Sequence, residues 1–106
     1  MAVTMEDFLL YLGYDVTDDE VVNRNATRAL NTAKQTVRGA VGDDVETYLP
    51  EDPRVAELVL IYADDLFSER GVSAKVSGAI RRAVADMELQ LRLELADVKA
   101  KEAAQA

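Results

Sequence analysis

Residues 22–40, VNRNATRALNTAKQTVRGA, decide the fold. Their apolar side chains recur at intervals of three or four residues, which places them on one face of an α-helix. These side chains are Val22, Ala26, Ala29, Leu30, Ala33, Val37 and Ala40. Most of them are small, so a second helix can approach this face closely. The segment therefore predicts a long helix that packs against another helix.

Capping residues mark both ends of this helix. Thr17 and Glu20 have the spacing of a capping box, and Gly42 is a residue type that commonly ends helices. We therefore expect the helix to run from Asp18 to Val41.

A short helix is expected before it. Thr4 can cap its first turn, with Asp7 as the partner in a partial capping box, and Gly13 supplies the end. One apolar face is formed by Met5, Phe8, Leu9 and Leu12.

A third helix follows residues 42–50, which read as a loop. Asp52 followed by Pro53 is typical of a helix start, and this helix is expected to end near Arg70. Its segment 58–63, LVLIYA, is apolar on all sides, which indicates a central and buried helix.

The last helix is expected to begin near Ser73 or Ser77 and to end at about residue 102. It carries two apolar stripes on opposite sides, so it should contact two different protein surfaces. The first stripe is Val76, Ile80, Val84, Met87, Leu91, Leu95 and Val98. The second is Leu89, Leu93, Ala96 and Ala100. We expect the first stripe to pack on the chain's own core and the second to contact a partner protein or a neighbouring subunit.

Together these segments predict an all-α fold, a small bundle of about four helices with a long C-terminal helix. At 106 residues the chain is expected to form a single helical domain over 1–106, with residues 99–106 as a fraying tail. The predicted core consists of Phe8, Leu12, Leu30, Ala33, Val37, Leu58, Val59, Tyr62, Leu66, Ile80 and Val84.

The residue types argue against catalysis. The chain has no Cys and no His, which removes disulfides, thiolate zinc sites and the commonest general base. Residues 15–20 are acidic enough to attract a hard cation, but helix capping explains them. Asp64, Asp65 and Glu69 could be read as a carboxylate set, although a solvated or interface face is the simpler interpretation. We expect no enzymatic activity, no metal and no cofactor.

No apolar run approaches the roughly 20 residues that a membrane span needs, and the N-terminus lacks the features of a signal peptide. We therefore expect no association with a membrane, and we expect synthesis in the cytoplasm.

The net charge of −8 is unevenly distributed. Residues 1–20 and 42–76 are strongly acidic, whereas residues 21–41 contain four basic residues and no acid. These four fall within an arc of about 120° on a helical wheel, opposite the apolar stripe. They are Arg24, Arg28, Lys34 and Arg38, and we call them the basic ridge. A solvated polar face would explain the ridge. We also expect it to serve as a subunit interface, because it could dock against the acidic surface of a neighbouring copy and close a ring.

Several motifs resemble the head–tail connector (head-completion adaptor) family of long-tailed bacteriophages. One is FLLYLGYD at 8–15, followed by the acidic cap TDDE at 17–20 and an Ala-rich helix with Ala29, Ala33 and Lys34. Another is Pro53 followed by LVLIYADDLFSERG at 58–71, where Phe67 stands in place of the usual Tyr. The resemblance covers most of residues 5–92 and includes no catalytic signature.

The resemblance implies a structural subunit of the virion at the head–tail junction. About twelve copies would form a ring between the portal protein and the tail-completion protein and extend the DNA channel. DNA would pass through without specific binding, and an acidic subunit suits this because it repels phosphate. A generic acidic helical adaptor that forms a small homo- or hetero-oligomer is the alternative.

Overall fold

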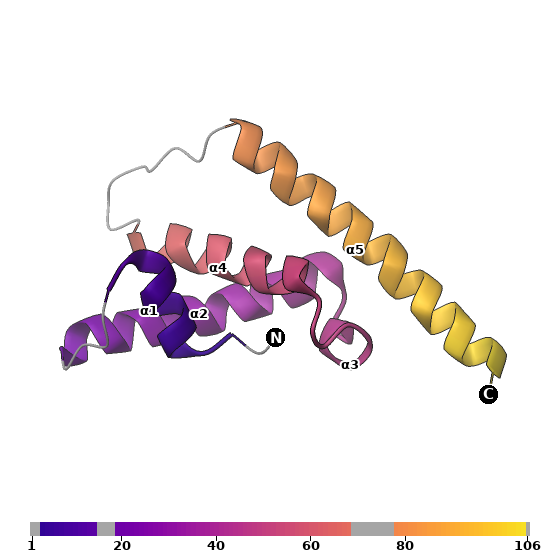
Figure 1. The fold of residues 1–106 in the computed structure, drawn as a ribbon, viewed down its shortest axis with the longest axis horizontal. Coiled ribbons are helices and arrows are strands. Elements are labelled where there is room, and N and C mark those ends of the chain that lie inside the picture. Colours follow the sequence, from indigo (N-terminus) through magenta and orange to yellow (C-terminus); the bar gives the residue numbers. More distant parts are fainter. Residues whose placement is uncertain (1–2, 15–18, 69–77, 106) are drawn as a thin grey trace.

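The computed structural model describes residues 3–14, 19–68 and 78–105, and these ranges contain helices and no strand (Figure 1). The elements are α1 (Met5–Leu12), α2 (Glu20–Val41), α3 (Val45–Tyr48), α4 (Pro53–Ser68) and α5 (Gly78–Gln105). The predicted all-α bundle with a long C-terminal helix is confirmed. The one-turn helix α3 was not predicted, because its residues were assigned to a loop.

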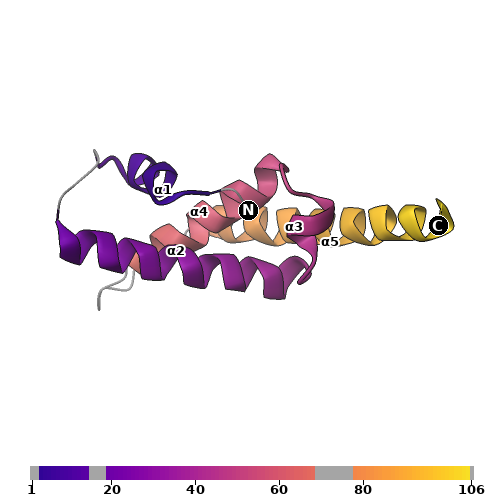
Figure 2. The same cartoon turned by 90° about the horizontal axis from the view of Figure 1, so that it is seen from below.

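Helices α2 and α4 run antiparallel and form the centre of the molecule, with α1 lying across both (Figures 1 and 2). Helix α5 packs on α4, on α2 and on α3. Its C-terminal part extends past the ends of α2 and α4, which gives the molecule dimensions of 50 by 30 by 18 Å.

The caps of α1 match the sequence prediction. The Asp7 backbone N–H donates to the Thr4 hydroxyl at 3.1 Å, and the Thr4 N–H donates to the Asp7 carboxylate at 3.0 Å. The hydrogen bond from the Thr4 backbone, followed by one from the Thr4 side chain, lowers the pKa of Asp7. Gly13 ends the helix with φ 87°, a left-handed conformation that glycine adopts without strain.

The start of α2 differs from the prediction. Asp19 is the N-cap, and its carboxylate accepts hydrogen bonds from the N–H groups of Val21 and Val22 at 2.9 and 3.2 Å. The helix begins at Glu20, so the capping box predicted for Thr17 and Glu20 is wrong, because Glu20 occupies the first helical position instead of the third. Asp is at least as favourable as Thr at the N-cap position, and Asp19 is the residue that precedes the first helical position.

The boundaries of the last two helices are partly as predicted. Asp52 caps α4 by accepting a hydrogen bond from the Arg54 N–H at 2.9 Å. The expected end of the third helix, at Arg70, lies outside the described residues. So does the expected start of the last helix, at Ser73 or Ser77. Helix α5 continues to Gln105, where the sequence predicted a fraying tail from residue 99.

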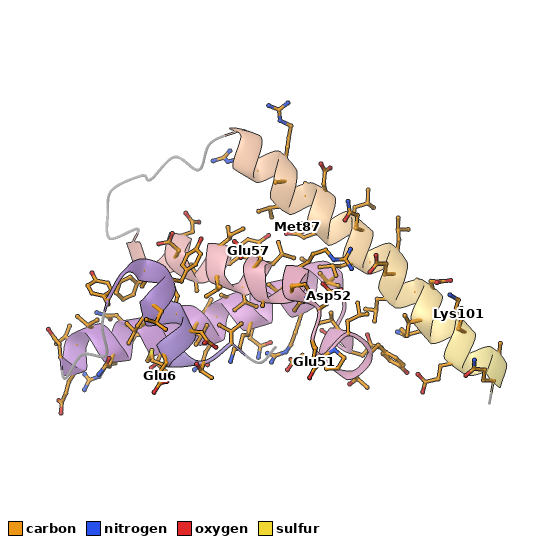
Figure 3. The ribbon with its side chains drawn as sticks, viewed as in Figure 1. Glu6, Glu51, Asp52, Glu57, Met87 and Lys101 are labelled. Atoms are coloured by element: carbon orange, nitrogen blue, oxygen red, sulfur yellow. The ribbon has the colours of Figure 1, made fainter. Side chains whose placement is uncertain are left out.

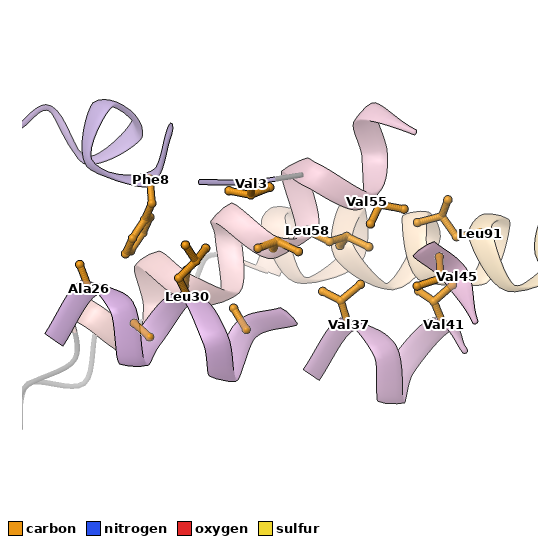
Figure 4. Close-up of a cluster of buried hydrophobic side chains, with 14 of the residues drawn as sticks. Val3, Phe8, Ala26, Leu30, Val37, Val41, Val45, Val55, Leu58 and Leu91 are labelled. Atoms are coloured by element: carbon orange, nitrogen blue, oxygen red, sulfur yellow. The ribbon is translucent and has the colours of Figure 1, made fainter. Parts of the chain in front are cut away.

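The core is continuous from α1 to α5 (Figure 4). Of the predicted core, Phe8, Leu30, Ala33, Val37, Leu58 and Val59 are buried, and Leu12, Tyr62 and Val84 are half-buried. Leu66 is 44% exposed, so its placement in the core was wrong. It lines an open pocket whose α2 wall consists of Asn25, Arg28, Ala29 and Thr32, so no large apolar side chain of α2 covers it. The side chain of Ile80 lies outside the described residues.

Candidate subunit interfaces

The basic ridge lies on α2, outside the buried stripe that faces α4, and Arg28 also lines an open pocket with Leu66 and Phe67 of α4. Arg24 and Arg28 are exposed, and Lys34 and Arg38 are half-buried. Within the described residues, no acidic side chain pairs with Arg24, Arg28 or Lys34. These three cations are therefore available to a partner.

Arg38 differs from the other members of the ridge. Its Nε donates to the carboxylate of Glu46 on α3, and this hydrogen bond lowers the pKa of Glu46. The ion pair ties α3 to the end of α2. The sequence could not reveal it, because the pairing depends on the chain turning back at Gly42. The ridge thus has three available cations instead of four.

An acidic surface lies on α4. Glu57 and Asp64 are seven positions apart and so share one side of the helix, opposite buried Val59. Glu57 is exposed, and Figure 3 marks its position on α4. Burial raises the pKa of the nearby Tyr11, and the charges of Glu57 and Asp64 raise it further. The acidic side of α4 therefore lies next to α1, on a different helix from the basic ridge.

Two of the three carboxylates considered as a catalytic set lie in the described residues. Asp64 and Asp65 are half-buried on α4, and Glu69 lies outside the described ranges. Asp65 lines an open pocket of about 240 Å³ with Ile61, Tyr62, Arg81 and Val84. Over residues 3–14, 19–68 and 78–105, no three carboxylates lie close enough to hold a metal ion. The acids at 15 and 18 fall outside those ranges.

The first stripe of α5 attaches the helix to the core. Leu91 and Leu95 are buried, and Val84, Met87 and Val98 are half-buried. A Cβ atom at Gly42 would lie 2.6 Å from Cδ2 of Leu95, so a larger residue at position 42 would force the Leu95 side chain to move. The described part of the first stripe lies as predicted, and the side chains of Val76 and Ile80 lie outside the described residues.

Polar contacts reinforce the attachment of α5. Arg54 forms a bidentate pair with Asp52, in which Nη2 lies 2.7 Å from the carboxylate, and it also pairs with Glu94 on α5. The Tyr62 hydroxyl donates to Glu88, and Lys99 Nζ lies 2.7 Å from Asp44 Oδ2. Burial, followed by the hydrogen bond to Glu88, raises the pKa of Tyr62 to about 12.

The second stripe of α5 faces outward. Leu89 is 51% exposed and Leu93 is 63% exposed, and Ala96 and Ala100 are exposed as well. Among the described elements, α5 contacts α2, α3 and α4 through the opposite side of the helix. The stripe is thus a second surface that the described part of the chain leaves uncovered, on a different helix from the basic ridge.

Comparisons with protein-family models, curated proteins and solved structures found no match. In the described part of the chain, no helix combines the length and apolar character of a membrane span.

Proposed function

We propose that this chain is a structural subunit of a phage head–tail connector. In this proposal about twelve copies form a ring that joins the portal protein to the tail-completion protein and extends the DNA channel. The ring belongs to the virion, and DNA passes through it without specific binding. The sequence resemblance supplies the identity of the assembly.

The observation that carries the proposal is the presence of opposite charges on different exposed surfaces of one subunit. Arg24 and Arg28 are exposed on α2 and form no ion pair with another described residue, and Glu57 is exposed on α4. Two different complementary surfaces produce a heterologous, head-to-tail contact. Such a contact generates a closed ring when the rotation between copies permits, whereas a two-fold dimer uses the same surface twice.

The net charge is consistent with a channel. A subunit with net charge −8 repels the phosphate backbone. DNA that must slide through a ring would be slowed by contacts to many Lys or Arg side chains, because each such contact releases counterions and strengthens binding.

Neutralising the exposed ridge tests the proposed contact. Arg24→Gln with Arg28→Gln should reduce the fraction of ring counted by negative-stain electron microscopy. The control, Arg81→Gln with Lys101→Gln, changes net charge equally at exposed sites on α5. Raising the salt from about 0.1 to 0.5 M should act like the ridge variant, because screening weakens exposed pairs. Rings that resist both changes would show that the ridge is not the contact.

A small adaptor would behave differently in the same experiment. It would give a dimer or a low-order complex in solution, with no closed ring at any concentration. That result would favour the alternative interpretation of the sequence.

A further inference from the structure

The outer stripe of α5 has the spacing of a coiled-coil seam. Leu89, Leu93, Ala96 and Ala100 are separated by four, three and four residues, which are the intervals of alternating d and a positions in a heptad. Both leucines are at least half exposed. Figure 1 shows the other described helices on one side of α5. The intervals are those of a helix that packs along another helix.

The residues beside the seam carry opposite charges on opposite flanks. Arg92, immediately before Leu93, occupies a g position, and Asp97, immediately after Ala96, occupies an e position. Arg92 is exposed, and among the described residues it forms no ion pair. Asp97 lies 3.0 Å from Lys101 in a pair whose side chains are both more than 60% exposed. Exposed pairs of this kind contribute little, so Asp97 can exchange partners.

We infer that α5 of one copy pairs with α5 of a second copy, parallel and in register, through this seam. In a parallel pair the g flank of each helix faces the e flank of the other, so Arg92 of each copy meets Asp97 of its partner. Two Arg92–Asp97 ion pairs then flank two apolar layers, one made of the two copies of Leu89 and the other of the two copies of Leu93.

The opposite orientation is disfavoured by the same charges. In an antiparallel pair g faces g, which brings Arg92 of one helix beside Lys99 of the other. That arrangement also opposes Leu93 with Ala96 and so replaces the leucine layers with mixed ones. Charge and apolar packing therefore both favour the parallel pair.

The shape of the molecule permits this contact. Leu91 and Leu95 face the chain's own core from the opposite side of α5, so the bodies of two paired copies would lie on the two outer sides of the helix pair. Asp86, the seam position before Leu89, would face Asp86 of the partner, and this repulsion confines the contact to the C-terminal part of α5. That part extends beyond α2 and α4 (Figure 1).

This inference rests on the proposed assembly only in naming a second copy as the occupant of the α5 face. It does not involve the basic ridge. Rings that form while α5 stays unpaired would refute the pairing and leave the proposed function intact. Paired α5 helices without rings would refute the proposed function and leave the pairing intact.

Cysteine cross-linking tests the orientation, because the chain has no native Cys. In the parallel pair the two copies of Ala100→Cys are adjacent and should form a disulfide-linked dimer under mild oxidation. In the antiparallel pair position 100 lies opposite 89, about 16 Å along the helix from its counterpart, which exceeds the reach of a disulfide. The control is Glu102→Cys, on the opposite side of the same helix turn. Equal cross-linking of both variants, or none at position 100, would overturn the inference.

Charge exchange tests the partners. Arg92→Asp alone and Asp97→Arg alone should each reduce cross-linking through position 100, each raising the dissociation constant about two- to thirtyfold because two ion pairs are lost. The double variant, Arg92→Asp with Asp97→Arg, should restore it, since the two charges have only exchanged places. A double variant weaker than either single one would contradict the pairing.

Discussion

Two leucines two positions apart on α5 should respond very differently to truncation. Leu91 is fully buried against the core, whereas Leu89 is 51% exposed on the outer side of the helix. Leu91→Ala removes three buried carbons, worth about 2.4 kcal/mol at roughly 0.8 kcal/mol each, and leaves a cavity that raises the loss to about 2.7–5 kcal/mol. Leu89→Ala opens no cavity and removes carbons that are already half hydrated, so the loss should be about 1 kcal/mol or less.

Urea unfolding followed by helical circular dichroism measures this difference. The dissociated chain is the appropriate sample, because Leu89 is expected to be covered in an assembly. The midpoint should fall strongly for Leu91→Ala and little for Leu89→Ala, with an unchanged dependence of the unfolding free energy on urea concentration. Equal losses at the two positions would refute the assignment of one stripe to the core and the other to a partner.

Two further predictions concern how α5 is held. Gly42→Ala should destabilise the chain by about 1–3 kcal/mol in the same assay. The new Cβ would approach Leu95 at 2.6 Å, and φ 154° is strained for other residues. An unchanged midpoint would mean that α5 does not approach α2 at this position. The pKa of Tyr62 is about 12 in the folded chain and about 10 in the unfolded chain. The neutral form of Tyr62 therefore stabilises the fold below about pH 10, and this stabilisation is lost as the pH rises towards 12. Tyr62→Phe should flatten this alkaline loss of unfolding free energy, and a profile identical to that of the unchanged chain would argue against the contact with Glu88.

The sequence was sufficient to predict the helices that carry strong local signals. The periodicity of α2, the capping pair Thr4 and Asp7, and the Asp52–Pro53 start all act within one or two helical turns. Local hydrogen bonds and side-chain spacing determine such features, so they can be read without the tertiary structure.

Contacts between distant segments could not be read in the same way. The pairing of Arg38 with Glu46 requires the turn at Gly42, and the burial of Val45 requires α3 to lie against the core. Leu66 fits the periodicity of α4, yet polar side chains on α2 leave it exposed. In each case the outcome depends on what the rest of the chain places opposite the residue.

For the candidate interfaces, the sequence identified the outer stripe of α5 and four ridge cations, of which Arg38 is paired with Glu46. It placed Leu91 on the stripe that holds α5 to the core, but it did not predict the bridge from Arg54 at the start of α4 to Glu94. The bridge joins residues 40 positions apart, so no local pattern indicates it.

The mass of the purified chain in solution tests the central claim most directly. One copy has a mass of 11.6 kDa. Analytical ultracentrifugation at low salt should detect a closed species of about twelve copies, visible as rings by negative-stain electron microscopy. A chain that remains a monomer or a dimer at every concentration and salt tested would contradict the ring.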